Sequence, residues 1–377
     1  MNKVPAVLVC DPGTGNLKIA GLTVLDRMVI AAHRAGCAPI VITADAPPSL
    51  PRAEALGIET SHVTSSPEDA VAAALRRRAG ERPDAAGRLQ HPALIINGGV
   101  LVDPRDVERV IRAGGELFAA DGSPLPVKMT TIESPPVIAL GFACAVTDAV
   151  SAREAERKFW ASLGSTADGL VDRYFNRPLG RLLSKLLVHT SVSPNEVSIV
   201  SILIGVAAAP FFAAGEFVVG ALLLQLCAVV DCVDGDLARA LFKESRLGKW
   251  LDIGGDQVVH CSVFVGIGIG VALTNPAVPA LLLGASAALG VLICFPLIVR
   301  GLRRPRSARG DLLNKLLDAT ANRDFSVLLL VLAICGRLDL FLWMAGIGIH
   351  LFWITLLVLE RIGSSRGTSA AIRRESA

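Results

Sequence analysis

The spacing of apolar residues divides the chain into two parts. As far as about Arg181, short apolar runs alternate with charged residues, prolines and glycines, whereas long apolar stretches dominate from Val197 to Leu359. Short runs suit the strands and helices of a water-facing domain, and about 20 apolar residues are needed to span a bilayer. We therefore expect a cytosolic domain at residues 1–165, a linker with an interfacial amphipathic helix at 166–196, a membrane domain at 197–362 and a disordered tail at 363–377.

The first part predicts an α/β fold. Its candidate elements are strand Val4–Val9, helix Gly21–Ala35, strand Ala38–Thr43, an exposed helix at Ala70–Arg78, strand Ala93–Asn97, helix Pro104–Arg112 and strand Val137–Leu140. Strands that alternate with helices in this way indicate an α/β sandwich with a mainly parallel sheet.

The second part predicts an all-α membrane domain of six transmembrane helices. The candidate spans are Val197–Ala214, Phe217–Arg239, Trp250–Leu273, Ala277–Val299, Asp324–Cys335 and Leu338–Leu359. Lysines and arginines gather before the first span, between the second and third, and between the fourth and fifth, while the alternate joints carry almost none. The positive-inside rule then places both termini and the basic loops in the cytosol, and an even number of spans satisfies it.

The fifth of these spans is unusual because its apolar part is short and polar residues precede it, among them Asn314, Lys315 and Asp318. A helix that is polar along its cytosolic half is tolerated at membrane depth only where that half faces protein or a water-filled cavity. This predicts a polar chamber open to the cytosol.

Composition excludes several classes of protein. The net charge is only +3, and the basic residues lie beside the apolar segments rather than on one polar face, so we expect no nucleic-acid partner. The eight cysteines include no CxxC pair and five lie in the apolar half, so neither a disulfide framework nor a zinc site is expected. The first residues lack the apolar core of a signal peptide, which keeps the N-terminal domain in the cytosol.

Aspartates at helical spacing mark the facing ends of the second and third spans. Asp231 and Asp234 are three residues apart, and Asp252 and Asp256 are four apart, so each pair projects from one face of its helix. Acids in apolar helices cost at least about 2.5 kcal/mol each near the bilayer centre, so a cation must offset them. Hard divalent cations bind carboxylates and often complete their shell with substrate phosphates, which points to a diphosphate substrate.

The plainer interpretation is that these are solvated acids in a loop between two spans. For the four paired aspartates we reject it, because they are embedded in apolar sequence. Gly235 and Gly248 support the rejection, since glycine in a helix costs about 1 kcal/mol and suggests close approach of a ligand or another helix. Asp236 lies off the common face, and for it both interpretations remain open.

The same residues resemble a known signature. The spacing Asp231-x2-Asp234-Gly235-x2-Ala238-Arg239-x8-Gly248-x3-Asp252-x3-Asp256 matches that of the CDP-alcohol phosphotransferase family at every fixed position. Six helices with the signature at the cytosolic ends of the second and third also look like that family. Gln257 is a departure, because many relatives carry a basic residue there.

The resemblance implies roles for these residues. Asp231, Asp234, Asp252 and Asp256 would bind two Mg²⁺ or Mn²⁺ ions that hold the CDP diphosphate, and Asp256 would also be the general base for the acceptor hydroxyl. Gly235, Ala238 and Gly248 would make room for the CDP moiety, and Arg239 would pair with a phosphate. A homodimer is expected by analogy with the family.

Two basic features follow the signature. Arg323 resembles an arginine that binds the acceptor phosphate in several branches, or else it is an interfacial side chain that reaches out to water. The run from Arg300 to Arg309 is interpreted as a lipid-facing patch. The approach segment Asp172–Arg181 and the Ser193–Ser198 stretch resemble the di-myo-inositol-phosphate phosphate synthase branch, whose members are often fused to an N-terminal cytidylyltransferase.

The N-terminal domain is therefore compared with cytidylyltransferases, whose first crossover it resembles from Leu25 to Thr43. Those enzymes carry a basic glycine-rich loop after the first strand and a metal-binding aspartate after a later one. Here the loop Asp11–Leu17 has no arginine, and the later site is Asn97-Gly98-Gly99. We expect a degenerate, non-catalytic domain; the alternative is an active cytidylyltransferase.

Together these observations predict a membrane transferase that moves a phospho-alcohol from a CDP-alcohol donor to a hydroxyl acceptor, such as a polyol phosphate, and releases CMP. The alternative is a transporter that binds cations with its intramembrane aspartates. That alternative requires a polar path across the bilayer, and the outer halves of the first four spans hold almost no polar residues.

Overall fold

The computed structural model describes residues 3–44, 46–64, 92–130, 134–164, 168–303, 311–319 and 325–375. The chain forms two compact units, Met1–Leu163 and Gly164–Ala377, which are described separately. The expected helix at Ala70–Arg78 and the side chain of Arg323 lie outside the described residues.

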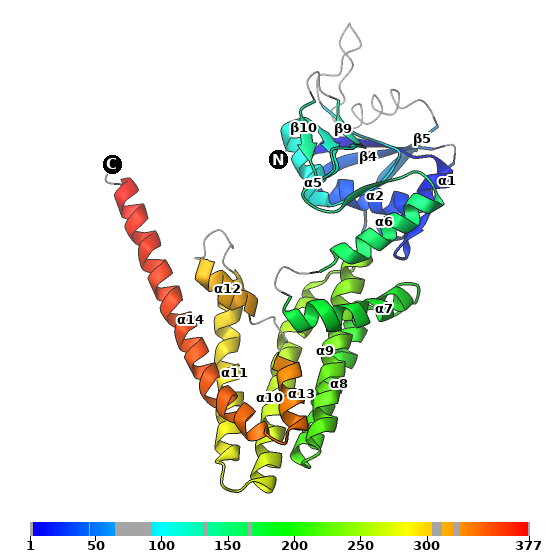
Figure 1. The fold of residues 1–377 in the computed structure, drawn as a ribbon. Helices are drawn as coiled ribbons and strands as arrows, with labels where there is room; N and C mark the ends of the chain where they lie inside the picture. The colour runs from blue at the N-terminus through cyan, green and yellow to red at the C-terminus, as the bar shows by residue number, and fades with distance from the viewer. Residues whose placement is uncertain are drawn as a thin grey trace. The chain divides into compact units, whose positions relative to one another are not determined.

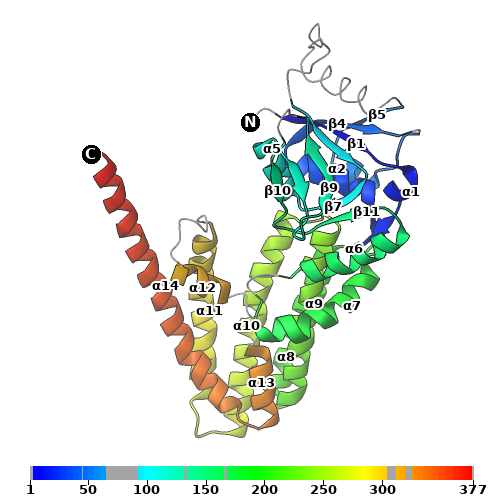
Figure 2. The same ribbon diagram turned by 45° about the horizontal axis from the view of Figure 1, so that its top comes forward.

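The first unit is built on a mixed seven-stranded sheet with the strand order β10-β8-β9-β6-β1-β4-β5 (Figures 1 and 2). The strands are β1 (Val4–Val9), β4 (Cys37–Thr43), β5 (Thr60–Val63), β6 (Leu94–Asn97), β8 (Glu116–Phe118), β9 (Pro124–Met129) and β10 (Pro136–Ile138). Four of its pairings are parallel, β1 with β4, β1 with β6, β4 with β5 and β8 with β10, whereas β9 runs antiparallel to β6 and β8. The predicted α/β class with a mainly parallel sheet is confirmed.

Smaller elements complete this unit. Two short antiparallel ladders pair β2 (Lys18–Ile19) with β3 (Leu22–Thr23) and β7 (Gly99–Val102) with β11 (Ala143–Val146). The helices are α1 (Pro12–Gly15), α2 (Val24–Arg34), α3 (Pro51–Ala55), α5 (Pro104–Ala113) and α6 (Ala149–Ser162).

Local sequence explains why the longer helices of this unit start where they do. Thr23 caps α2, since its side chain accepts a hydrogen bond from the Asp26 amide at 3.1 Å. Asp103 caps α5 in the same way, with Pro104 at the first helical position, and Gly114 ends the helix in the left-handed region at φ 65°.

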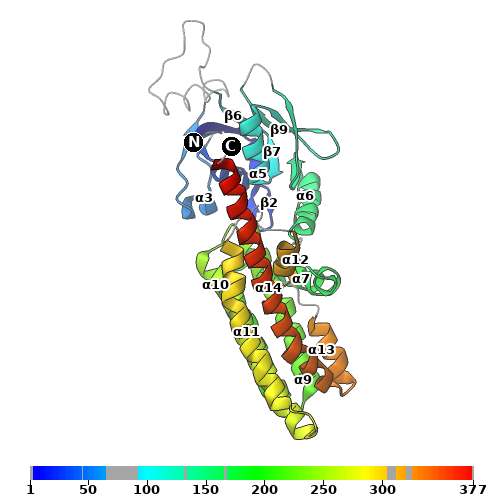
Figure 3. The same cartoon turned by 90° about the vertical axis from the view of Figure 1, so that its left-hand side faces the viewer.

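The second unit is helical. It contains a π-helix, η1 (Asp172–Asn176), followed by α7 (Arg177–Leu187), α8 (Pro194–Ala213), α9 (Phe217–Ala240), α10 (Arg246–Thr274), α11 (Ala280–Arg303), α12 (Asp311–Ala319), α13 (Phe325–Ile334) and α14 (Leu338–Glu375) (Figures 1 and 3). By length and composition, five of the described helices can cross a membrane: α8, α9, α10, α11 and α14. The remaining predicted span, α13, has 10 residues, so the six-span count is not confirmed.

The sequence explains where α8 begins and why α7 is amphipathic. Ser193 and Glu196 form a capping box at the start of α8, and Pro194 takes the first helical position. On α7 one face is buried through Gly180 and Ser184, while Leu179, Leu182 and Leu186 are exposed on the other. This is the pattern of the amphipathic helix that was expected before the first span.

The expected disordered tail at 363–377 is wrong in its secondary structure, because α14 continues as a helix to Glu375. The sequence after Gly363 contains no proline to stop a helix that the preceding apolar turns have already started.

Candidate functional site

All four motif aspartates line one cavity of about 400 Å³ in the second unit. Its walls come from η1, the start of α7, the N-terminal end of α8, the C-terminal end of α9 and the N-terminal end of α10. Asp234 is buried, Asp231 and Asp256 are half-buried, and Asp252 is exposed, so the carboxylates run from the protein interior to the mouth of the cavity.

The tight connection between α9 and α10 brings the two aspartate pairs together. Phe242 adopts the left-handed conformation at φ 53°, and the Lys243 amide bonds back to the Ala238 carbonyl at 2.8 Å, which closes the end of α9. Ser245 then caps α10 by accepting a hydrogen bond from the Gly248 amide at 2.9 Å. The chain reverses within a few residues, so the C-terminal end of α9 and the N-terminal end of α10 both border the cavity, while α8 packs against both helices.

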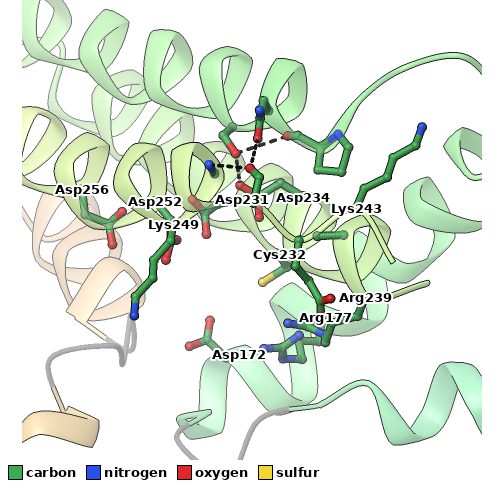
Figure 4. Close-up of a pocket in the computed structure, with 18 of the residues that line it drawn as sticks. Asp172, Arg177, Asp231, Cys232, Asp234, Arg239, Lys243, Lys249, Asp252 and Asp256 are labelled. Atoms are coloured by element: carbon green, nitrogen blue, oxygen red, sulfur yellow. Dashed lines mark hydrogen bonds between the residues drawn. The ribbon is translucent and has the colours of Figure 1, made fainter. Parts of the chain in front are cut away.

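Figure 4 shows how the acidic side chains lie. The carboxylates of Asp231, Asp234 and Asp252 point toward a common region from the two helices, and Asp256 follows one turn further along α10. Asp234 is held from a third helix, because the Ser198 hydroxyl of α8 donates a short hydrogen bond to its Oδ2. The sequence analysis named Ser198 only as the end of a stretch that resembles one family branch, and it did not predict this hydrogen bond.

The oxygen ligands of the cavity fit a hard divalent cation, since carboxylates from two helices line the same cavity. Among the residues that the structure describes, no three histidine, cysteine or acidic side chains are placed closely enough to hold one ion. The carboxylates thus line one cavity, but no three of them lie close enough together to coordinate the same ion.

A second charged cluster lies at the other side of the cavity, where Asp236 is fully buried. Its Oδ1 is 2.8 Å from Nη2 of Arg239 and 3.3 Å from Nη1 of Arg177. Arg177 also pairs with Asp168 through its Nε and Nη2 atoms, at 2.5 and 2.8 Å. The interpretation of Asp236 as a solvated loop acid is therefore wrong: it is an interior charge balanced by two arginines.

Arg177 remains a cation in this cluster. Burial opposes its charge, but the hydrogen bond and the negative charge of Asp168 raise the pKa of Arg177 above its ordinary value. The cavity is therefore bordered by a fixed network of two arginines and two aspartates, Arg177, Arg239, Asp168 and Asp236.

The motif glycines make room for protein side chains. A Cβ atom on Gly235 would lie 3.1 Å from Nη1 of Arg239, and one on Gly248 would lie 2.9 Å from Oδ1 of Asn195. Gly235 therefore lets the guanidinium fold back over α9, and Gly248 lets the start of α8 approach α10. Ala238 lines the cavity, as the expected contact with a nucleotide requires.

Several lining residues were missed from sequence: Asp168, Asp172, Arg177, Asn195, Lys243, Glu244 and Lys249. Asp172 and Arg177 belong to the approach segment Asp172–Arg181, whose resemblance to a family branch was the one sequence signal for them. Their distance from the motif in sequence hides their proximity to it in space. Gln257 does not line the cavity; its Nε2 donates to the Ile253 carbonyl at 3.3 Å within its own helix.

Comparison with known proteins agrees with this site. Residues 191–359 match the family model described as CDP-alcohol phosphatidyltransferase. This part of the chain, a little under half of its length, is therefore similar to the CDP-alcohol phosphatidyltransferase family. The match begins in the segment between α7 and α8 and includes every motif residue.

Two curated relatives illustrate the resemblance. The chain is 29% identical over 243 residues to a protein of Rubrobacter xylanophilus named bifunctional IPC transferase and DIPP synthase, covering 64% of this chain and 50% of the relative. It is 33% identical over 94 residues to the archaetidylinositol phosphate synthase of Pyrococcus horikoshii, covering 25% of this chain and 50% of the relative. The chain thus spans about half the length of these relatives.

Among solved structures, the phosphatidylinositol phosphate synthase of Mycobacterium tuberculosis in its apo form is similar at 20% identity. The alignment covers 47% of this chain and 94% of that protein, with a TM-score of 0.37. A likeness of this strength carries no argument about the site.

Proposed function

We propose that the second unit transfers a phospho-alcohol from a CDP-alcohol to a hydroxyl acceptor, with release of CMP. The observation that carries this proposal is the convergence of Asp231, Asp234, Asp252 and Asp256 on one cavity. The match of residues 191–359 to the CDP-alcohol phosphatidyltransferase family model supports the same reaction class.

The four aspartates are the residues that would hold divalent metal, two ions of Mg²⁺ or Mn²⁺. When bound, such ions neutralise the diphosphate and stabilise the CMP leaving group.

The other charged side chains of the cavity would bind and orient the substrate. Arg239 and Lys243 lie on the cavity wall, where their charges attract phosphate oxygens. Asp256 lies one turn beyond Asp252 and would accept the proton of the acceptor hydroxyl, which makes that oxygen a better nucleophile. Arg323 is proposed to meet the acceptor phosphate, although it lies outside the described residues.

The relatives suggest the substrate class. Their names refer to IPC and DIPP, archaetidylinositol phosphate and phosphatidylinositol phosphate. We propose a phosphorylated polyol, such as inositol phosphate or glycerol phosphate, as the acceptor, and a CDP-alcohol such as CDP-diacylglycerol or CDP-inositol as the donor.

The proposed setting is the cytoplasmic membrane, with six spans and with both termini and the cavity on the cytosolic side. The charge bias of the joints supports that orientation. The short α13 would count as the fifth span, lying against α9 rather than lipid alone. A homodimer is proposed as the assembly.

The N-terminal unit is proposed to be a degenerate cytidylyltransferase-like domain. The loop after β1 is closed by the protein itself: the Thr14 hydroxyl donates to the Thr147 carbonyl at 3.2 Å, and the Thr14 methyl lies against Gly99. The Gly99 contact joins the loop that follows β1 to the segment that follows β6, at the edge where parallel sheets bind nucleotides, whereas Thr147 belongs to the segment that follows β11. Formation of a CDP-alcohol from CTP and an alcohol phosphate by residues 1–163 would contradict this.

The transferase proposal is tested by measuring CMP from purified protein in detergent, with CDP-diacylglycerol or CDP-inositol and with inositol phosphate or glycerol phosphate. Asp256→Asn should lower turnover at least about a hundredfold, since general base catalysis contributes about 10²–10⁴. Asp339→Asn is the matched control, because Asp339 pairs with Arg337 at the start of α14 and does not line the cavity. Undiminished turnover in Asp256→Asn would refute the base assignment.

A further inference from the structure

The π-helix η1 lies on the wall of the cavity and contains two buried polar residues. π-Helices are rare and occur frequently at functional sites. Here the first and last residues, Asp172 and Asn176, are buried, while Arg173, Tyr174 and Phe175 between them are exposed. The Asn176 amide donates a hydrogen bond to Oδ1 of Asp172 at 2.7 Å. The π-turn thus turns both polar side chains inward.

Asn176 is the third member of a chain of hydrogen bonds that crosses three elements. The Ser326 hydroxyl of α13 donates to Oε1 of Gln225 on α9 at 2.9 Å. Nε2 of Gln225 in turn donates to Oδ1 of Asn176 at 2.5 Å. All four residues are buried, at most 6% exposed: Ser326, Gln225, Asn176 and Asp172.

The direction of the chain is fixed by chemistry. A carboxylate can only accept, so the amide of Asn176 must present its NH₂ to Asp172 and its oxygen to Gln225. Gln225 is fixed in the same sense by the donor hydroxyl of Ser326. A buried polar network in which every link is satisfied is rigid, and leaving one link open costs desolvation energy. The network therefore sets the orientation of the Asp172 carboxylate.

Asp172 lines the cavity, and Figure 4 shows it across the cavity from Asp252. A carboxylate at this place repels phosphate oxygens but accepts hydrogen bonds from hydroxyl groups. The motif does not include this residue, and the family match over residues 191–359 does not reach it.

We propose that Asp172 binds hydroxyl groups of a substrate, and that Asn176, Gln225 and Ser326 are positioning residues that hold it in place. This inference rests on the proposed transferase reaction. The hydroxyls can belong to the ribose of the cytidine nucleotide or to the polyol acceptor, and both present the same chemistry to a carboxylate.

The test measures KM for donor and acceptor separately, with CDP-diacylglycerol, inositol phosphate and CMP release. Asp172→Asn is the sharpest variant, because it removes the negative charge of the side chain while its Oδ1 can still accept a hydrogen bond from Asn176. A hydrogen bond to a charged group contributes enough that KM for the contacted substrate should rise about tenfold or more. A donor that lacks the ribose 2′-hydroxyl identifies the source: if the ribose is bound, Asp172→Asn abolishes the preference of the unaltered protein for the ribose donor.

Ser326→Ala tests the positioning role from a residue outside the cavity lining. It should raise the same KM by about two- to fivefold, which matches the loss of one ordinary hydrogen bond. Ser286→Ala is the matched control, because Ser286 also bonds within the helical unit, to Gly346 and His350, but has no link to η1. It should leave both KM values unchanged.

The outcomes separate this inference from the proposed function. If the unaltered protein releases no CMP from any of the donor and acceptor pairs, the proposed function fails. If it turns over and Asp172→Asn lowers only kcat, with both KM values unchanged, the carboxylate does not bind substrate hydroxyls and the inference fails. A purely structural role would reduce the active fraction and would not move one KM alone.

Discussion

The guanidinium of Arg239 lies over Gly235, one helical turn earlier on α9, so closely that a Cβ atom there would be 3.1 Å from Nη1. Arg239 reaches from this position to the buried Asp236, at 2.8 Å. The glycine and the arginine of the motif are therefore linked to each other as well as to any nucleotide.

Gly235→Ala should displace the Arg239 side chain and lower transferase activity by about tenfold, because a phosphate-binding charge would move. Helix propensity alone would make this variant more stable, with a free energy of unfolding higher by about 1 kcal/mol, so a loss of activity would not come from a weaker helix. Gly348→Ala, at an open position on α14, is the control and should leave activity unchanged. Equal activities of the two variants would show that the position of Arg239 does not matter.

Asp236→Asn should break the link between Arg177 and Arg239. Arg239 would lose its charged partner, whereas Arg177 would keep Asp168. The free energy of unfolding in detergent should fall by less than the about 3–5 kcal/mol of a fully buried pair, because Arg239 is partly exposed. A double-mutant cycle with Arg239→Gln measures the coupling between the two side chains, and additive effects would contradict the ion pair.

The pattern of apolar residues was sufficient to predict most of the fold. The strands at β1, β4 and β6, the helices α2 and α5, and the five long helices all follow directly from runs and alternation that are visible in sequence. β5, β8 and β9 were missed. β9 contains two prolines, Pro124 and Pro126, that weaken the strand signal, and β8 has only three residues.

The motif aspartates could be predicted because helical spacing converts sequence distance directly into a shared face. The opposite wall of the cavity could not. Asp172 and Arg177 lie more than fifty residues from the motif, and only the packing of η1 and α7 against α9 brings them to it. The burial of Asp236 was equally hidden, since its neighbours in space, rather than in sequence, balance its charge.

Metal removal should abolish transferase activity, since the four carboxylates would otherwise repel the diphosphate of the donor. We expect dialysis against EDTA to eliminate CMP release and added Mg²⁺ or Mn²⁺ to restore it. Bound metal should also raise the Tm of the unaltered protein. Asp231→Asn combined with Asp252→Asn should remove that Tm increase, which makes the test independent of turnover. Full activity in the presence of EDTA would contradict a metal-dependent site.

The division of the chain into two units predicts where the transferase activity lies. Among the residues that the structure describes, those that line the cavity all lie between Asp168 and Asp256, inside the second unit. A chain shortened to residues 164–377 should therefore retain transferase activity in detergent when a CDP-alcohol is supplied, within about threefold of the full chain, because a hydrophobic core of its own holds α8, α9, α10 and α11 together. CMP release and the KM for CDP-diacylglycerol are measured for both chains, and the Tm of each chain shows whether it is folded. If the shortened chain keeps its Tm but loses turnover, the first unit must contribute to the reaction, and the assignment of the whole site to the second unit would be wrong.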